Sequence, residues 1–145
     1  MTTLTSIAPQ GSQSAEATAA GQAALLLDAQ SVAALHQLDP TGANRLVQRV
    51  MTTYRSSLDR LLGELTLARA RNDVASLRLV THTLKSSSAS VGALALSALC
   101  SDAEQAVREG SLALLPALLD QLEVEAVWVD NAVLQLLADP LTNAR

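Results

Sequence analysis

This chain of 145 residues has few of the residues that build sheets and tight turns. It has no Phe, one Trp and one Tyr, and it has only six Gly and four Pro. Hydrophobic residues nevertheless make up 49% of the chain, so the core must be built from Leu, Val and Ala. Ala and Leu are strong helix formers, whereas aromatic residues favour strands. The composition therefore predicts an all-α fold in one domain.

Other scarcities exclude whole classes of protein. The only cysteine, Cys100, has no partner for an intramolecular disulfide, and its apolar surroundings predict a buried thiol in a reducing compartment. The net charge of −4 argues against nucleic-acid binding, although six arginines gather between residues 45 and 71 and eight carboxylates between 102 and 139. No run of about 18 apolar residues and no export signal is present, so we expect a cytoplasmic protein that binds no membrane.

The expected organisation is a leader, one helical domain and a short tail. Residues 1–22 are rich in Thr, Ser, Ala, Gln and Gly, and we expect them to be disordered. Apolar residues recur at spacings of three and four from 23 to 139, which predicts amphipathic helices. Residues 140–145 form the tail.

Capping residues divide the first part of the domain into three helices. A short helix capped by Asp28 comes first and ends near Asp-Pro-Thr-Gly. A long helix from about 42 to 71 follows. Either Asn72 or Asp73 caps the third helix, which Gly92 closes or interrupts.

Two more helices complete the domain. The fourth ends at Gly110, and the last begins near 111–116 and runs through Leu119, Leu122, Val127, Leu134 and Leu137. Trp128 is expected in the core or at an interface. Helices joined by short loops bury their apolar stripes most simply in an antiparallel four-helix bundle, to which the first helix is a short N-terminal addition.

One histidine stands in a pattern that indicates phosphoryl chemistry. Lys85, the only lysine, follows His82 by three residues, so both side chains share a face of the third helix. Neutral imidazole, with an ordinary pKa of about 6.5, offers a nucleophilic nitrogen at physiological pH. An ammonium beside it can neutralise a phosphoryl group. His82 is therefore the candidate phosphoacceptor, and Lys85 a candidate to support the phosphate.

The rest of that helix face suits a protein partner. At 100° per residue, Arg78 and Ser86 lie about 40° to either side of His82, which makes both candidates for phosphate support. Leu79 and Ala89 lie within about 60° of it and are candidates for an apolar docking patch. The imidazole is expected to point outward, because apolar residues occupy the opposite side of this helix: Leu77, Val80, Leu84 and Val91.

Other kinds of site are not indicated. His36 has no such neighbours and is interpreted as an ordinary residue, and the two histidines and Cys100 lack the spacing of metal ligands. The serines between 86 and 90 lack the Gly-x-Ser-x-Gly pattern of a nucleophile. No nucleotide-binding glycine motif accompanies the helices, so we expect no kinase activity.

These motifs together resemble a known family. The run His82-Thr83-Leu84-Lys85 followed by small residues, then Val91-Gly92-Ala93 and Leu99-Cys100 with Glu104, resembles the histidine-containing phosphotransfer (HPt) domain of multistep phosphorelays. The similarity spans about residues 28–137. One departure is Ser86, where the family commonly has glycine, and we expect it to tune the site without abolishing its function.

The resemblance implies a phosphocarrier that is not itself an enzyme. His82 would accept a phosphoryl group from an aspartyl-phosphate on a receiver domain, such as that of a hybrid sensor kinase, and pass it to the receiver of a response regulator. Mg²⁺ would belong to the receiver, so no cofactor is expected on this chain, which we expect to be a monomer. Two alternatives stay open: a docking module that is not phosphorylated, and an excised part of a larger kinase.

Overall fold

This computed structural model describes residues 26–139 of the chain, which contain five α-helices joined by loops. They are α2 (Ala29–Leu38), α3 (Leu46–Ala70), α4 (Val74–Ser90), α5 (Leu94–Glu109) and α6 (Leu115–Ala138). The described residues contain no strand, which confirms the all-α prediction, and none of their helices is long and apolar enough to cross a membrane. The predicted leader, residues 1–22, and tail, residues 140–145, lie outside the described residues.

Three helix boundaries follow from local sequence. Asp28 caps α2 and Asp73 caps α4, because each carboxylate accepts a hydrogen bond from the backbone N–H three residues later, at Ser31 and Ser76. Gly110 ends α5 in the left-handed conformation, with φ at +74°. These boundaries match the predictions because they depend on contacts within a single turn.

The start of α3 depends on a longer loop. The helix begins at Leu46, later than the predicted start near Gly42. The buried carboxylate of Asp39 accepts hydrogen bonds from the backbone N–H groups of Asn44 and Leu46, at 3.2 and 3.1 Å. Arg45 takes the left-handed conformation, with φ at +52°, and only then does the regular helix begin. Asp39 therefore caps α3 from a distance.

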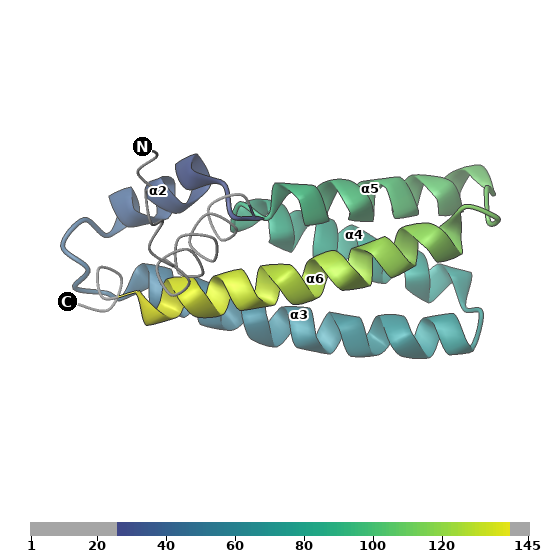
Figure 1. The fold of residues 1–145 in the computed structure, drawn as a ribbon, viewed down its shortest axis with the longest axis horizontal. Coiled ribbons are helices and arrows are strands. Elements are labelled where there is room, and N and C mark those ends of the chain that lie inside the picture. Colours follow the sequence, from purple (N-terminus) through teal and green to yellow (C-terminus); the bar gives the residue numbers. More distant parts are fainter. Residues whose placement is uncertain (1–25, 140–145) are drawn as a thin grey trace, which may run out of the picture.

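The four longer helices form an antiparallel bundle. Figure 1 shows α3, α4, α5 and α6 running side by side along the long axis, with α2 at one end. Each helix packs against the next along the chain, and α6 closes the bundle against α3. α4 and α6 therefore lie diagonally opposite each other. The predicted four-helix bundle with an additional N-terminal helix is confirmed.

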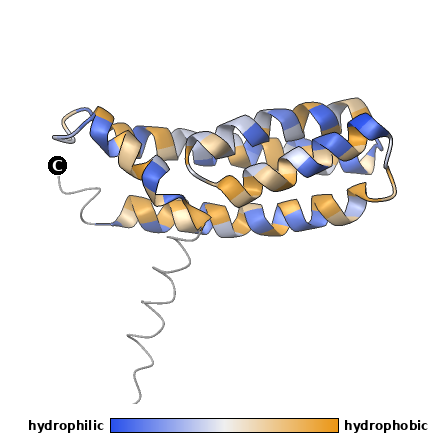
Figure 2. Ribbon diagram, turned by 90° about the horizontal axis from the view of Figure 1, so that it is seen from above, coloured by the Kyte–Doolittle hydropathy of each residue, from blue (hydrophilic) through white to orange (hydrophobic). Residues whose placement is uncertain are grey.

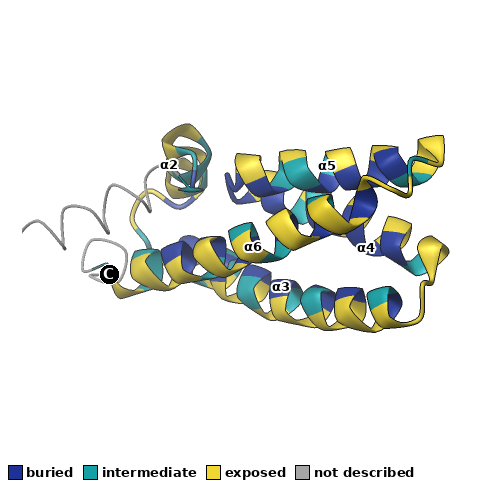
Figure 3. Ribbon diagram, turned by 45° about the vertical axis from the view of Figure 1, so that its right-hand side comes forward, coloured by how far each residue is buried: buried dark blue, intermediate teal, exposed yellow. Residues whose placement is uncertain are grey.

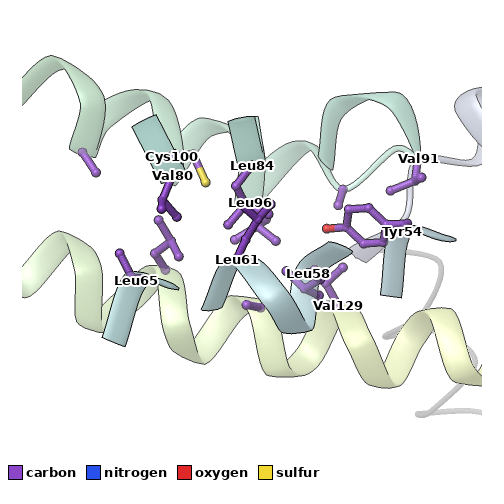
Figure 4. Packing of buried hydrophobic residues seen from close by; sticks show 14 of the residues in the cluster. Tyr54, Leu58, Leu61, Leu65, Val80, Leu84, Val91, Leu96, Cys100 and Val129 are labelled. Carbon is purple, nitrogen blue, oxygen red and sulfur yellow. The ribbon is translucent and has the colours of Figure 1, made fainter. Parts of the chain in front are cut away.

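The core fills the space between these four helices (Figure 4). Its largest fully buried side chains are aliphatic: Met51, Leu58, Leu65, Leu84, Leu96 and Leu122. Tyr54 is also buried, and its hydroxyl lies 2.9 Å from that of Ser88. Cys100 is buried, as the sequence predicts, and burial raises the pKa of its thiol to about 12, so the thiol is protonated at neutral pH.

Gly92 joins the bundle to α2. Its φ is +84°, and a Cβ at this position would lie 2.9 Å from the backbone nitrogen of Asp28. The carbonyl of Gly92 accepts a hydrogen bond of 2.8 Å from that same nitrogen. The loop between α4 and α5 thus fixes where α2 begins, and only glycine permits the close approach.

The predicted inner face of α6 is partly wrong. Leu119 and Leu122 are buried as expected, but Val127 and Leu134 are 56% and 41% exposed. Trp128 is 55% exposed and is therefore not a core residue. Hydrophobic residues recur along the whole of α6 (Figure 2), so their spacing does not single out one inner face. The helix instead turns smaller side chains inward: Ala126, Val129, Ala132 and Val133.

Candidate functional site

His82 lies in the middle of α4, on its outer side. Its side chain is 60% exposed, while the opposite side of the helix buries Leu77, Val80 and Leu84. Figure 3 shows this division between buried and exposed residues along the helices. The phase of α4 is therefore the predicted one, and a second protein can reach the imidazole.

Glu104 on α5 lies directly behind this imidazole. One carboxylate oxygen, Oε1, is 3.1 Å from Nδ1 of His82, and the other, Oε2, is 2.8 Å from Nζ of Lys85. A guanidinium nitrogen of Arg108, one turn further along α5, lies 3.4 Å from Oε1. The Glu104 side chain is only 6% exposed, so one buried carboxylate joins an exposed histidine to two cations.

The ionisation of Glu104 decides which nitrogen of His82 carries a proton. The hydrogen bond from Lys85 lowers the pKa of Glu104, burial opposes this effect, and the hydrogen bond with His82 lowers the pKa further. Glu104 is therefore a carboxylate at neutral pH. Because a carboxylate only accepts hydrogen bonds, Nδ1 of neutral His82 is the donor. The other nitrogen, Nε2, keeps its lone pair.

Lys85 is held in place from two sides. Its ammonium pairs with Glu104, and its backbone carbonyl accepts a hydrogen bond of 2.9 Å from the hydroxyl of Ser97 on α5. Its side chain is 31% exposed, so the ammonium lies at the border between the protein and solvent. The charge predicted to support a phosphate thus stands beside His82 on the α5 side of α4.

The other predicted residues surround His82 on the surface. Arg78, Ser86 and Ala89 are all exposed. Leu79 is 67% exposed and lines a hollow of about 210 Å³ whose walls include Leu67 from α3. Charged residues, among them Glu64 and Arg71, line the same hollow, so Leu79 stands at a mixed border with α3, while Lys85 and Glu104 lie on the α5 side of His82.

Glu104 is one of the residues that carry the family resemblance, but no pattern in the sequence predicts that Glu104 or Arg108 belongs to the site. One signal was present, because Glu104 follows Cys100 by one helical turn on the side of α5 that also buries Ala103. A carboxylate on a buried stripe needs partners, and only the packing of α4 against α5 shows which they are.

Among residues 26–139, no group of three or more His, Cys, Asp or Glu side chains is placed to hold a metal ion. Both carboxylate oxygens of Glu104 are already in contact with His82, Lys85 and Arg108.

Comparison with known proteins points to one family. Residues 49–139 match the family described as the Hpt domain. A crystal structure of histidine-containing phosphotransfer protein B (HptB) from Pseudomonas aeruginosa PAO1 is similar, with a TM-score of 0.70 and 26% sequence identity. The alignment covers 78% of this chain and 95% of that protein. No curated protein matches the sequence.

Proposed function

This chain belongs to the Hpt domain family, and on that premise we propose that His82 is its phosphoacceptor, taking a phosphoryl group from one receiver domain and passing it to another. The observation that carries the proposal is the contact of 3.1 Å between Nδ1 of the exposed His82 and the buried carboxylate of Glu104. Because the Nδ1 hydrogen is bonded to this carboxylate, the lone pair lies on Nε2, which therefore acts as the nucleophile.

The transfer needs no acid or base on this chain. The lone pair of Nε2 forms a bond to phosphorus while the bond from phosphorus to the aspartyl oxygen of the receiver breaks, and that aspartate leaves as a carboxylate. The proton on Nδ1 stays in place throughout. Glu104 stabilises the positive charge that the imidazole acquires as the new bond forms, because its carboxylate accepts the Nδ1 hydrogen. The same steps in reverse deliver the group to a second receiver.

Cations around His82 support the phosphorylated state. A phosphoryl group adds nearly two negative charges, as phosphorylation of a hydroxyl side chain does. Lys85 and Arg108 are held near His82 by their ion pairs with Glu104. Exposed Arg78 lies on the same face of α4 as His82. The hydroxyl of Ser86 adds a hydrogen-bond donor where the family commonly has glycine.

Receiver domains are the proposed partners. Leu79 and Ala89 provide an apolar surface next to the nucleophile, and small side chains at Ser86 and Ala89 leave room for a docking protein. The receiver supplies the Mg²⁺ and the acidic residues that activate the phosphoryl group, so this chain acts as a carrier without kinase activity. The cytoplasm is the proposed location, because relays of this kind operate there. All the groups of the site come from α4 and α5 of a single copy of the chain.

The experiment is transfer from a phosphorylated receiver domain, followed by ³¹P NMR and a test of acid lability. Wild type and His36→Gln should both form an acid-labile, base-stable phosphoramidate, whereas His82→Gln should form none. His36 is the matched control because it is also exposed and lies on α2, away from α4. Label that persists in His82→Gln, or its absence from wild type with several active receivers, would favour a docking module that is not phosphorylated.

A further inference from the structure

Glu104 pairs with two cations, and the structure holds them differently. Nζ of Lys85 lies 2.8 Å from Oε2, and the Lys85 side chain is 31% exposed. A guanidinium nitrogen of Arg108 lies 3.4 Å from Oε1, and the Arg108 side chain is 58% exposed. Oε1 also faces Nδ1 of His82 at 3.1 Å. The carboxylate therefore has a close cation on one oxygen and a looser one, largely in solvent, on the other.

One of these cations is in excess before any phosphoryl group arrives. The hydrogen bond from Lys85 is the largest cause of the lowered pKa of Glu104, so Lys85 by itself compensates the buried charge. Arg108 adds a second positive charge to a site that holds a single carboxylate and a neutral imidazole. The second cation therefore has no evident task in the unphosphorylated chain.

Phosphorylation would change this balance, and here the inference rests on the function proposed above. A phosphoryl group on Nε2 of His82 brings nearly two negative charges to the site. Lys85 lies one helical turn from His82 on the same face of α4, so its ammonium is drawn to the phosphoryl oxygens. Glu104 must stay ionised, because it still accepts the Nδ1 hydrogen. A buried carboxylate that loses its cation is strongly destabilised, so Glu104 then needs another partner.

We propose that Arg108 is a positioning residue that takes over the charge of Glu104 when Lys85 turns to the phosphoryl group on His82. Arg108 follows Glu104 by one turn of α5 and already contacts its carboxylate. A guanidinium carries five N–H donors in a planar fork, so it can bind both oxygens of a carboxylate at once. Its exposed side chain closes on Glu104 without any change in the core. Arg108 acts through Glu104 and does not touch the phosphoryl group.

The exchange needs movement only at the end of the Lys85 side chain. The backbone carbonyl of Lys85 accepts a hydrogen bond of 2.9 Å from the hydroxyl of Ser97, which holds α4 against α5 while the ammonium moves. When the phosphoryl group leaves for a second receiver, Lys85 returns to Glu104. The site thus alternates between two arrangements, and in both of them the buried carboxylate has a cation.

Lys85 gives the direct test, because it is the only lysine of the chain. Selective ¹⁵N labelling of lysine therefore yields a single side-chain ammonium signal, which NMR can record in the full chain before and after phosphorylation by a receiver domain. In wild type this signal should move when the phosphohistidine forms. In Arg108→Gln it should move less, because Lys85 has to stay with Glu104.

The equilibrium constant for transfer from the receiver to His82 gives the second readout. It should fall about three- to tenfold in Arg108→Gln, since the lost ion pair joins a buried carboxylate to an exposed guanidinium. Arg108→Lys keeps a cation and should restore most of the wild-type value. Arg60→Gln is the matched control, because Arg60 is 59% exposed and also pairs with a glutamate four residues away, Glu64 on α3. This control should equal wild type in both readouts.

Three results would overturn the proposal and leave the proposed function intact. The first is a Lys85 signal that does not move when wild type is phosphorylated. The second is Arg108→Gln with both readouts of wild type, as expected if one ammonium bridges Glu104 and the phosphoryl group. The third is a lowered equilibrium constant with an unchanged movement of the Lys85 signal, which would mean that Arg108 binds the phosphoryl group itself. If His82 of wild type carries no phosphoryl group at all, the proposed function fails, and this inference fails with it.

Discussion

Two of the interfaces between helices, which we call the α4–α5 seam and the α3–α6 seam, carry ion pairs, and the side chains of these pairs differ in burial. Between α4 and α5, the Glu104 side chain is 6% exposed and meets His82, Lys85 and Arg108. Between α3 and α6, Arg55 and Asp130 pair at 2.8 Å with side chains that are 35% and 34% exposed. Burying a charge costs several kcal/mol unless partners compensate, whereas a pair at the rim costs and contributes little. The buried carboxylate of the α4–α5 seam is therefore costly unless its partners stay in place, which fits the proposed role of this seam in phosphotransfer, whereas the α3–α6 pair is an ordinary rim pair.

Removing the charge of Glu104 should have the largest effect. Glu104→Gln keeps the shape of the side chain but loses the carboxylate that accepts the Nδ1 hydrogen of His82. We expect the rate of phosphotransfer to fall about 10- to 100-fold, because hydrogen bonds to charged groups contribute about 1.5–3 kcal/mol. Single-turnover transfer from a phosphorylated receiver measures this rate. Exposed Glu109 on the same helix is the control, and an unchanged rate in Glu104→Gln would remove the carboxylate from the mechanism.

Removing the ammonium of Lys85 should have the next largest effect. Lys85→Gln should slow transfer roughly tenfold, which corresponds to about 1.5 kcal/mol. It should also raise the pKa of Glu104, because the hydrogen bond from Lys85 is the main cause of its lowered value. NMR titration of the Glu104 side-chain carbon follows this pKa. A pKa equal to that of wild type would mean that the contact of 2.8 Å does not persist in solution.

Acid should weaken the α4–α5 seam. The pKa of Glu104 is lower in the folded chain than its ordinary value, so folding favours the ionised form. Its contribution to the free energy of unfolding is complete above the ordinary glutamate pKa of about 4.3 and is lost as the pH falls through the lowered folded value. Urea denaturation from neutral to acid pH should therefore show a steeper acid loss in wild type than in Glu104→Gln. If the free energy of unfolding of the two proteins fell equally with acid, Glu104 would not be the group responsible.

The α3–α6 seam should give the smallest effect. A double-mutant cycle with Arg55→Ala and Asp130→Ala should yield a coupling of about 0.2–1 kcal/mol in the free energy of unfolding, because both side chains are about one-third exposed. All variants of the cycle should keep the wild-type rate of phosphotransfer. A larger coupling, or a slower transfer, would remove the distinction between the two seams.

Much of the fold could be predicted because its signals are local. The caps at Asp28 and Asp73 and the glycine at 110 act within one helical turn. The outward position of His82 follows from the repeat of 100° per residue against the buried side of α4. α3 begins later than its sequence pattern predicts, because the Asp39 carboxylate accepts a hydrogen bond from its first residue across a loop that no short pattern describes.

By itself the sequence determined the helices, their caps and the face of α4 that carries His82, since each of these depends on neighbours within a turn or two. Only the tertiary structure brought Glu104 to His82 and Lys85, from 22 and 19 residues away along the chain. It also decided which side of α6 is buried. A helix that is apolar on several sides carries no periodic signal, and the close packing of α3 and α5 against it selects the side that turns inward.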